Sequence, residues 1–335
     1  MMTTSQIVVV GSINVDLIVR VDRRPAPGET VLGRSFAVSP GGKGANQAVA
    51  AARLGGSVAM VGAVGDDEYA GVALGGLREA GVNLAPVRLA RPGSGERTGV
   101  AVITVDADGD NSIVVVPGAN ATVGAAAVTD EEELLVGAAA VVVQAEIPRD
   151  GVEAAARLAG GRLVVNLAPA VEVNPEVLLR ADPLVVNEHE GASALALLRG
   201  GQVGEPDANP RRDPLSIPVG MTAAARIADD EAVIVRALVQ EGVASVVLTR
   251  GARGCVVGRR DESGVQVSEI PALRVRTIDT TGAGDAFVGA LTVGLVDGQS
   301  LEDAARYATR VAAYSVQSRG AQTSYPTSSE LGTVR

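Results

Sequence analysis

The chain has 335 residues, of which 47% are hydrophobic, and its formal net charge is −10. This length supports one large α/β domain, with or without a small accessory part. The acidic balance and the scarcity of aromatic residues (no Trp, two Phe and four Tyr) disfavour binding to nucleic acid, which needs basic surfaces and stacking platforms.

A single cysteine, Cys255, excludes a disulfide within the chain and agrees with a reducing compartment. The first residues lack the basic and apolar segments of a signal peptide, and no apolar run is long enough to span a membrane. We therefore expect a cytoplasmic protein with small-molecule partners and no association with a membrane.

Short β-branched runs alternate along the chain with longer Ala-rich segments. The runs are continuously apolar, as in strands covered on both faces, and lie at residues 7–10, 58–62, 140–143, 163–166, 184–187 and 246–249. Helical stretches are predicted at residues 45–54, 68–80, 152–158, 223–240, 283–296 and 301–318. This alternation predicts a three-layer α/β/α domain with a mainly parallel central sheet.

Two regions break the alternation and predict a small second β-sheet. Residues 15–21 and 31–39 have the composition of strands, and a turn-rich segment at 106–110 joins two further strands at 98–105 and 111–116. We expect one domain over residues 1–335, with lid strands from about 15–39 and 98–117 inserted in it. Residues 199–220 predict a mobile surface-loop insertion.

The strongest motif is Asp-Thr-Thr-Gly-Ala-Gly-Asp-Ala-Phe, which runs from Asp279 to Phe287 between a strand-like segment at 274–278 and an apolar helix. Glycines at a helix start let backbone amides approach an anion, and the helix dipole favours negative charge there. Asp285 then lies where it can accept the proton of an alcohol that attacks a phosphoryl group. A glycine turn before an ordinary capped helix is the alternative.

Two earlier motifs carry polar side chains that suit a polyhydroxyl ligand. Lys43 and Asn46 lie at the start of a helix after a pair of glycines, in Pro-Gly-Gly-Lys-Gly-Ala-Asn-Gln-Ala, which does not match a Walker A loop. Asn14 and Asp16 follow the first strand and, two residues apart in an extended segment, face the same side. A solvated lysine and a plain turn are the alternatives.

Two motifs follow later strands. Asn187 and Glu190 could organise a hydrated Mg²⁺, or simply form an acidic helix N-terminus. The glycine turn from Thr249 to Gly254 could hold a nucleotide or only reverse the chain. His189 is the only histidine and no G-x-S-x-G elbow is present, which argues against a Ser-His-Asp hydrolase.

Together and in this order, these segments resemble the carbohydrate kinase family that contains ribokinase, fructokinase and adenosine kinase. The resemblance extends from Val8 to about Pro326, and the Asp-Thr-Thr-Gly-Ala-Gly-Asp run is highly specific for the family. The Gly-Gly-Lys-Gly-Ala-Asn-Gln-Ala run and the segment 319–324 are most similar to the members that phosphorylate ribose.

The resemblance implies a role for each motif. Asp285 is the expected catalytic base, and the expected anion hole is formed by Gly282, Ala283 and Gly284. The sugar ligands implied beside Asp285 are Asn14, Asp16, Gly42, Lys43, Asn46, Ala101, Ile103 and Glu146. The residues implied to lie along ATP and its Mg²⁺ are Asn187, Glu190, Thr249, Gly251, Gly254, Gly282, Gly284 and Thr309. An activating K⁺ site is implied at Asp279, Thr281, Ser315, Gly320 and Ser324.

The implied reaction is ATP-dependent phosphorylation of D-ribose at its 5-hydroxyl, in a homodimer formed through the lid. Two features depart from the family pattern: the 199–220 segment is an insertion, and Thr309 stands where His or Asn is expected. Alternatives are a kinase for deoxyribose, fructose or a nucleoside, and a non-catalytic sugar-binding regulator. A nicotinamide oxidoreductase is disfavoured because the first strand lacks the dinucleotide glycine pattern.

Overall fold

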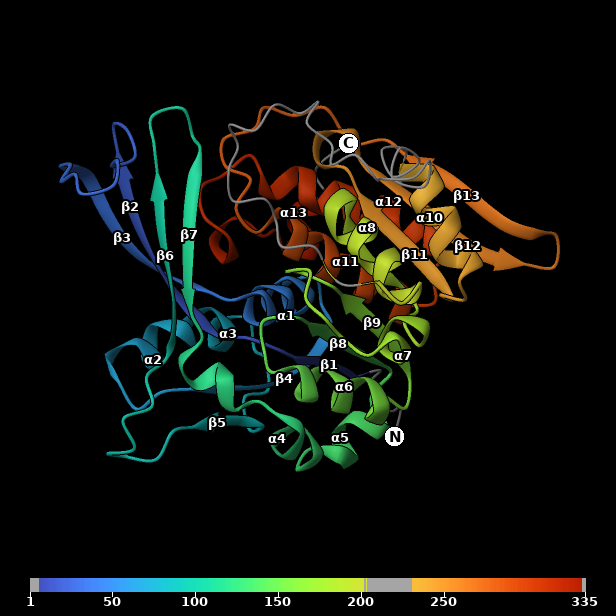
Figure 1. Cartoon of the computed structure of the whole chain (residues 1–335), viewed down its shortest axis with the longest axis horizontal. Coiled ribbons are helices and arrows are strands. Elements are labelled where there is room, and N and C mark those ends of the chain that lie inside the picture. Colours follow the sequence, from blue (N-terminus) through green and yellow to red (C-terminus); the bar gives the residue numbers. More distant parts are fainter. Residues whose placement is uncertain (1–5, 202, 204–230, 333–335) are drawn as a thin grey trace.

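The computed structural model describes residues 6–201, 203 and 231–332 (Figure 1). Its main sheet has nine strands within these residues. In the order across the sheet that follows, every neighbouring pair from the third strand to the ninth is parallel. The order across the sheet is β13 (Gly264–Ile270), β12 (Cys255–Asp261), β11 (Ser245–Thr249), β10 (Leu184–Asn187), β9 (Arg162–Asn166), β8 (Ala140–Gln144), β1 (Gln6–Val10), β4 (Ser57–Val64) and β5 (Val87–Leu89).

Helices cover both faces of this sheet because its central strands are apolar on both sides. In β1, Ile7 and Val9 belong to one buried cluster, whereas Val8 and Val10 belong to a second cluster on the opposite face. The first face is covered by α1 (Lys43–Arg53), α3 (Gly75–Glu79), α11 (Ala283–Val296), α12 (Leu301–Ser315) and α13 (Ser328–Leu331). The second is covered by α4 (Ala125–Thr129), α5 (Glu132–Gly137), α6 (Arg149–Leu158), α7 (Pro175–Leu179), α8 (Glu188–Leu198) and α10 (Glu231–Gln240).

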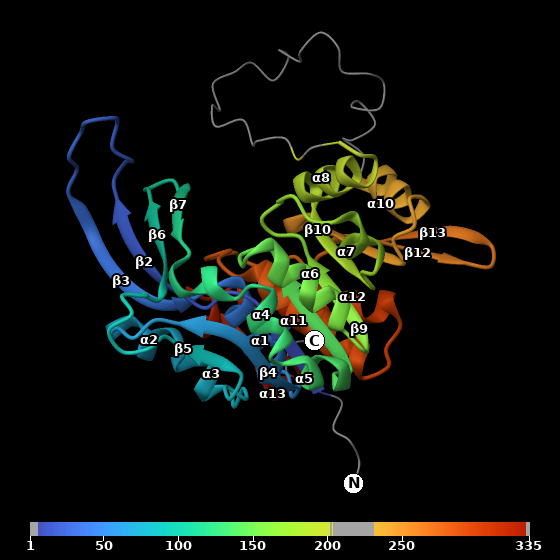
Figure 2. The ribbon, with the colours of Figure 1, turned by 60° about the horizontal axis from the view of Figure 1, so that its bottom comes forward.

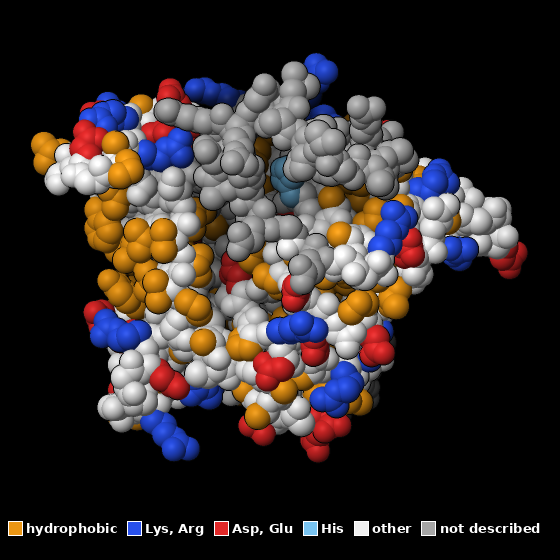
Figure 3. Space-filling model, viewed as in Figure 1, with side chains coloured by type: hydrophobic (Ala, Val, Ile, Leu, Met, Phe, Trp, Pro, Cys, Tyr) orange, Lys and Arg blue, Asp and Glu red, His pale blue; other side chains and the backbone are white. Residues whose placement is uncertain are grey.

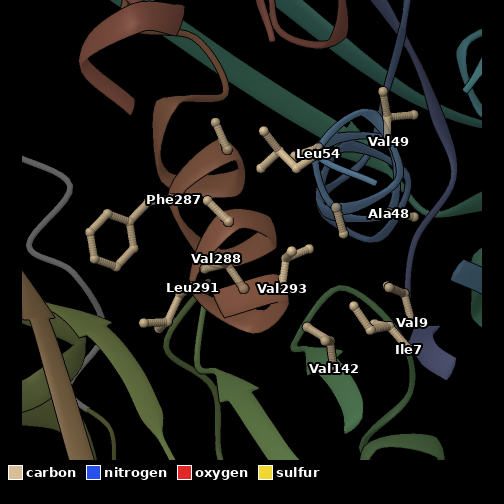
Figure 4. Packing of buried hydrophobic residues seen from close by; sticks show 14 of the residues in the cluster. Ile7, Val9, Ala48, Val49, Leu54, Val142, Phe287, Val288, Leu291 and Val293 are labelled. Carbon is tan, nitrogen blue, oxygen red and sulfur yellow. The ribbon is translucent and has the colours of Figure 1, made fainter. Parts of the chain in front are cut away.

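The core of the first face is centred on α11, which is buried around most of its circumference. Figure 4 shows Val288, Leu291 and Val293 of this helix among apolar side chains of α1 and of the strands, including Ala48 and Val142. Since a helix that is apolar all round must be enclosed, this packing fixes where the N-terminus of α11 lies relative to α1. The position of the motif at residues 279–285 follows from that packing.

A second sheet contains β3 (Gly33–Gly41), β2 (Asn14–Val21), β6 (Gly99–Val105) and β7 (Asn111–Val116), in that order. It extends to one side of the main sheet (Figures 1 and 2). Helix α2 (Glu68–Ala73) contacts its base. The turn predicted at 106–110 is present, with the Asp106 amide donating to the Asp110 carbonyl at 3.0 Å.

The predicted fold class is confirmed, and three details of the prediction are wrong. The helix predicted at 68–80 is broken at Leu74, where a pair of glycines lowers helix propensity. The segment 274–278 is not a strand; the Ile278 amide instead donates to the Val316 carbonyl at 2.7 Å. That contact also explains why α12 ends at Ser315 rather than at 318. The loop predicted at 199–220 and the start of the helix predicted at 223–240 fall mostly outside the described residues.

Candidate active site

The site is built around the N-terminus of α11. Gly282 precedes the helix with φ 72°, a conformation that favours glycine, and a Cβ there would lie 2.4 Å from the Tyr325 hydroxyl oxygen. That hydroxyl donates to the Gly282 carbonyl at 3.0 Å and so holds the turn. The Ala283 amide donates to the Thr280 carbonyl at 3.2 Å, so this amide of the predicted anion hole is already paired within the turn.

Asp285 lies in the first turn of α11 and is only 8% exposed. Its Oδ2 accepts a hydrogen bond from Asn46 Nδ2 at 2.9 Å, and its Oδ1 accepts one from Gln47 Nε2 at 3.0 Å. Burial raises the pKa of Asp285, while Lys43 and the two amide hydrogen bonds act against that rise. The carboxyl group therefore has the raised pKa of a proton acceptor, with donors that favour its ionised form.

Lys43 is the first residue of α1 and lies among carboxylates. Gly42 precedes it with φ 89°, and a Cβ on Gly42 would lie 2.8 Å from the Asn14 amide nitrogen. Glu146 Oε2 accepts from the Lys43 amide at 3.2 Å, and Glu146 Oε1 lies 4.0 Å from Lys43 Nζ. Burial disfavours the charged ammonium, but the surrounding carboxylates raise the pKa of Lys43: Asp285, Glu146, Glu190 and Asp16.

Asn14 is held in one orientation by a neighbour that the sequence did not single out. Asn120 accepts from the Ile13 amide at 2.9 Å and donates to the Ile13 carbonyl at 3.1 Å, which fixes its amide. The same Nδ2 donates to Asn14 Oδ1 at 2.7 Å. Because that oxygen accepts from Asn120, the remaining polar group of the Asn14 side chain is its Nδ2 donor.

Asp16 completes a polar cluster, which consists of Asn14, Asp16, Lys43 and Glu146. Burial, and then the charges of Glu146 and Asp285, raise the pKa of Asp16 to about 6. In the second sheet Asp16 pairs with Ala101, and Ile103 lies two residues further along the same strand. Residues opposite each other share a face, so Ala101 and Ile103, both buried, lie on the face of the sheet that carries Asp16.

A cavity of about 580 Å³ adjoins the other side of the α11 N-terminus. Its lining includes most of the residues predicted to lie along ATP, together with Ala283: Thr249, Gly251, Gly254, Gly284 and Thr309. Apolar residues such as Leu273, Phe287 and Val316 line the remainder. The Thr309 hydroxyl donates to the Ala305 carbonyl at 2.8 Å, so it is satisfied within its own helix.

Asn187 and Glu190 do not line this cavity but form the N-cap of α8. The Asn187 side chain accepts from the Glu190 amide at 2.9 Å, and the Glu190 carboxylate accepts from the Asn187 amide at 2.8 Å. The alternative interpretation of this motif, a helix N-terminus with acidic residues in its first turn, is therefore observed, and the magnesium role stays a prediction. Burial raises the pKa of Glu190, with Lys43 acting against that rise, which places this carboxylate within electrostatic range of the polar cluster.

Direct hydrogen bonds join three of the five predicted cation residues. Asp279 accepts from the Thr281 amide at 3.0 Å and the Gly320 amide at 3.0 Å, so three predicted members are joined. Burial acts to raise the pKa of Asp279, but the hydrogen bonds from Gly320 and Thr281 lower it. The Ser315 and Ser324 hydroxyls donate to the Ala312 and Ala321 carbonyls of their own segments. Such hydroxyls keep oxygen lone pairs that suit K⁺.

Several polar residues of the site were missed from the sequence. Ser12 donates to Glu146 at 2.6 Å, and buried amides surround the base and the Asn14 side chain. Gln47 and Gln322 lie inside the two runs that carried the resemblance, one position from Asn46 and two from Gly320. Their position in those runs was the available signal. The other missed amides are Asn120, Gln144 and Asn166.

Comparison with known proteins agrees with this geometry. Residues 4–328 match the pfkB family carbohydrate kinase model. The ribokinase of Bacillus subtilis is 38% identical over 328 residues, 97% of each chain, and the deoxyribokinase of Salmonella typhimurium is 35% identical over 324 residues, 96% of this chain and 95% of the relative. Arabidopsis thaliana ribokinase, solved in complex with ribose and ATP, superposes with a TM-score of 0.78 at 28% identity and 98% coverage of both chains.

The chain therefore belongs to the pfkB family of carbohydrate kinases. This membership makes it a phosphotransferase that acts on a sugar hydroxyl, as the sequence predicted. Over the described part of the chain, no helix is both long and apolar enough to cross a bilayer.

Proposed function

We propose that this chain catalyses the ATP-dependent phosphorylation of D-ribose at its 5-hydroxyl, giving ribose 5-phosphate and ADP. One observation carries the proposal. Ala283 and Gly284 line the cavity, while the next residue, Asp285, contacts α1 on the side of the polar cluster. A carboxylate at this junction lies between a nucleotide in the cavity and a polyol beside Lys43 and Asn14.

The chemistry follows from that position. The Asp285 carboxylate accepts the proton of the sugar hydroxyl as the hydroxyl oxygen bonds to the γ-phosphorus of ATP. The bond between the γ-phosphorus and the bridging oxygen breaks, and ADP leaves with the electron pair. Backbone amides at the α11 N-terminus stabilise the negative charge on the transferred group. Lys43 and the polar cluster hold the sugar in place.

Metal ions are expected to assist at two places. Mg²⁺ bound with ATP would neutralise phosphate charge, and Glu190 and Asn187 would hold it through water, as suits an ion that keeps its hydration. Among the described residues no three His, Cys, Asp or Glu side chains group as metal ligands, so phosphate and water oxygens must complete that shell. K⁺ would be held by Asp279 together with the hydroxyl and carbonyl oxygens around it.

The small sheet is proposed to act as a lid over the sugar. Ala101 and Ile103 present apolar side chains on the face that carries Asp16, where they would exclude water from the transferred phosphoryl group. The substrate ATP and the buried, unpaired thiol of Cys255 support a cytoplasmic location. The segment 199–220 has no role in this proposal.

A second copy of the chain is the proposed partner of the lid. Exposed apolar side chains occur along three of its strands, and Figure 3 shows hydrophobic side chains gathered over the β6–β7 side of the molecule. They are Phe36, Val38, Val102, Ile113, Val114, Val115 and Val116. Apolar surface of this extent on a protruding sheet is typical of an interface.

Deoxyribose is the second candidate substrate, because the similarity to the Salmonella deoxyribokinase extends over 96% of the chain. A coupled assay of ADP release with ribose, 2-deoxyribose, fructose and a nucleoside, each with and without K⁺, decides between them. The proposal requires kcat/KM to be highest for ribose. A higher value for 2-deoxyribose would move the assignment to that sugar, and sugar-independent ADP release would contradict a sugar kinase.

A further inference from the structure

Buried amide side chains surround the Asp285 carboxylate, and most of them are not among the residues predicted to contact the sugar or the nucleotide. Two of them, Asn46 and Gln47, bond to the carboxylate directly from α1. The others reach it through these two, and the whole set is Asn46, Gln47, Gln144, Asn166 and Gln322. All are at most 8% exposed, so bulk water does not substitute for their mutual hydrogen bonds.

The orientation of the Gln47 amide is fixed by the backbone rather than by the carboxylate. The Val185 carbonyl can only accept, so Asn166 must direct its Nδ2 toward it, at 3.1 Å. Asn166 Oδ1 then faces Gln47 Nε2, at 2.9 Å. Since the Nε2 group carries two hydrogens, its second one meets Asp285 Oδ1 at 3.0 Å.

Gln144 lies at the other end of the same amide. With the orientation of Gln47 fixed by Asn166, the Gln47 Oε1 points away from Asp285 and accepts from Gln144 Nε2 at 2.6 Å. The side chain of Gln47 is therefore held by Gln144 from β8 and by Asn166 from β9. With its amide oriented by Asn166 of β9, Gln47 can offer only a donor to the base.

We propose that Gln47 is a positioning residue for Asp285, which it holds as an oriented hydrogen-bond acceptor in the proposed phosphoryl transfer. With Gln47 on Oδ1 and Asn46 on Oδ2, neither carboxylate oxygen can rotate freely, and each keeps a lone pair for the sugar hydroxyl. The proposal rests on the proposed function, because it assigns Gln47 to the same base. Gln47 itself needs no contact with the sugar.

The charges around Asp285 determine how its titration will respond. Lys43 lowers the pKa of Asp285 and Glu146 raises it. The charge of Asp285 in turn raises the pKa of Asp16, Glu190 and Tyr325. Loss of the Gln47 donor leaves all these groups in place. The resulting change in the acid limb of the pH profile can then be assigned to that hydrogen bond.

The test compares Gln47→Glu and Gln47→Met with the wild type. Glu has the shape of Gln but replaces the donor with a second carboxylate, and Met keeps the length without polar atoms. We expect the acid limb of the kcat–pH profile to move up by about one pH unit or more in both, further in Gln47→Glu. At neutral pH kcat should fall about tenfold or more, with the sugar dissociation constant changed less than about threefold.

Gln299→Glu is the matched control, since Gln299 is exposed and lies at the opposite end of α11 from Asp285. It should leave the pH profile unchanged. Thermal unfolding of each variant separates loss of fold from loss of positioning. Unchanged acid limbs in both folded Gln47 variants would overturn the proposal, because a residue that only packs would alter stability and not the titration of the base.

A second measurement tests the positioning role of Gln47 without depending on the proposed function. The carboxyl ¹³C signal of Asp285, identified by its loss in Asp285→Asn, can be titrated in wild type and Gln47→Met without any substrate. A higher pKa in the variant supports the positioning role even if ribose is not the substrate. An equal pKa in the two proteins contradicts it, whatever sugar the enzyme uses.

Discussion

Asn46 Nδ2 and Asp285 Oδ2 are joined by a hydrogen bond of 2.9 Å between residues 239 positions apart in the chain. The other end of the Asn46 amide accepts from Gln322 Nε2 at 3.0 Å. Asn46 therefore links the proposed base to the segment that contains Gly320 and Ser324 of the proposed cation site. One hydrogen of its Nδ2 remains available for the sugar, so a ligand role and a role in holding the base are compatible.

The first prediction concerns the base. Asp285→Asn keeps the shape of the side chain but cannot accept the proton of the sugar hydroxyl, so kcat should fall about 100-fold or more. Ribose binding, measured by calorimetry, should persist, because Lys43, Asn14 and Asp16 are unchanged. Near-normal turnover in the variant would remove Asp285 from the mechanism.

Much of the fold was predictable because its signals are local. The strand β1 is continuously apolar since both of its faces are covered, and the turn at 106–110 joins β6 to β7 through its own residues. The end of α12 was not predictable, because it depends on a contact between Val316 and Ile278, which lie far apart in the sequence. Periodicity does not encode such contacts.

The candidate site likewise has a part that was predictable from the sequence and a part that was not. The residues proposed to contact substrate lie in short glycine-containing motifs, so Lys43 and Asp285 could be proposed from the sequence. The amides behind them were missed: Gln47 lies inside a run that carried the resemblance, but the sequence does not distinguish a buried glutamine from an exposed helical one. Its partner Gln144 lies 97 positions away, and the pair is brought together only by the packing of α1 on β8.

The second prediction tests the sugar subsite. Lys43→Ala removes a cation that lies among four carboxylates, and it should raise the ribose KM about tenfold or more, with a smaller effect on the KM for ATP. Initial-rate kinetics with each substrate varied in turn provide the measurement. A rise confined to the KM for ATP would place Lys43 at the nucleotide instead.

The third prediction follows from Asp16, whose pKa burial raises from 3.8 to about 6. A carboxyl group with a raised pKa in the folded state stabilises the protein less as it ionises, so stability is lost as pH rises from below 3.8 through about 6. Asp16→Asn removes this dependence. Without ligands, the unfolding free energy of the variant minus that of the wild type should rise by about 2 kcal/mol from about pH 4 to about pH 7.

Denaturant unfolding at the two pH values measures that difference, and ribose kinetics measure how the Asp16→Asn substitution changes activity. Asn cannot supply the charged acceptor of Asp16, so the ribose KM should rise while the apoprotein becomes more stable at neutral pH. An equal difference between variant and wild type at both pH values would show that Asp16 titrates at its ordinary pKa in the folded chain.

The last prediction concerns the lid as an interface between two copies. Val114 and Val115 are neighbours in β7 and therefore point to opposite faces of the small sheet, and both are exposed, at 64% and 46%. The double variant Val114→Lys/Val115→Lys places a charge on each face, which a buried apolar interface does not tolerate. Light scattering should show a dimer for the wild type and a monomer for the variant.

Lysines at Val72 and Val136, exposed apolar residues of α2 and α5 outside the sheet, serve as the control and should leave the dimer intact. A wild type that is monomeric at micromolar concentration would contradict the interface, and the exposed valines would then require another partner.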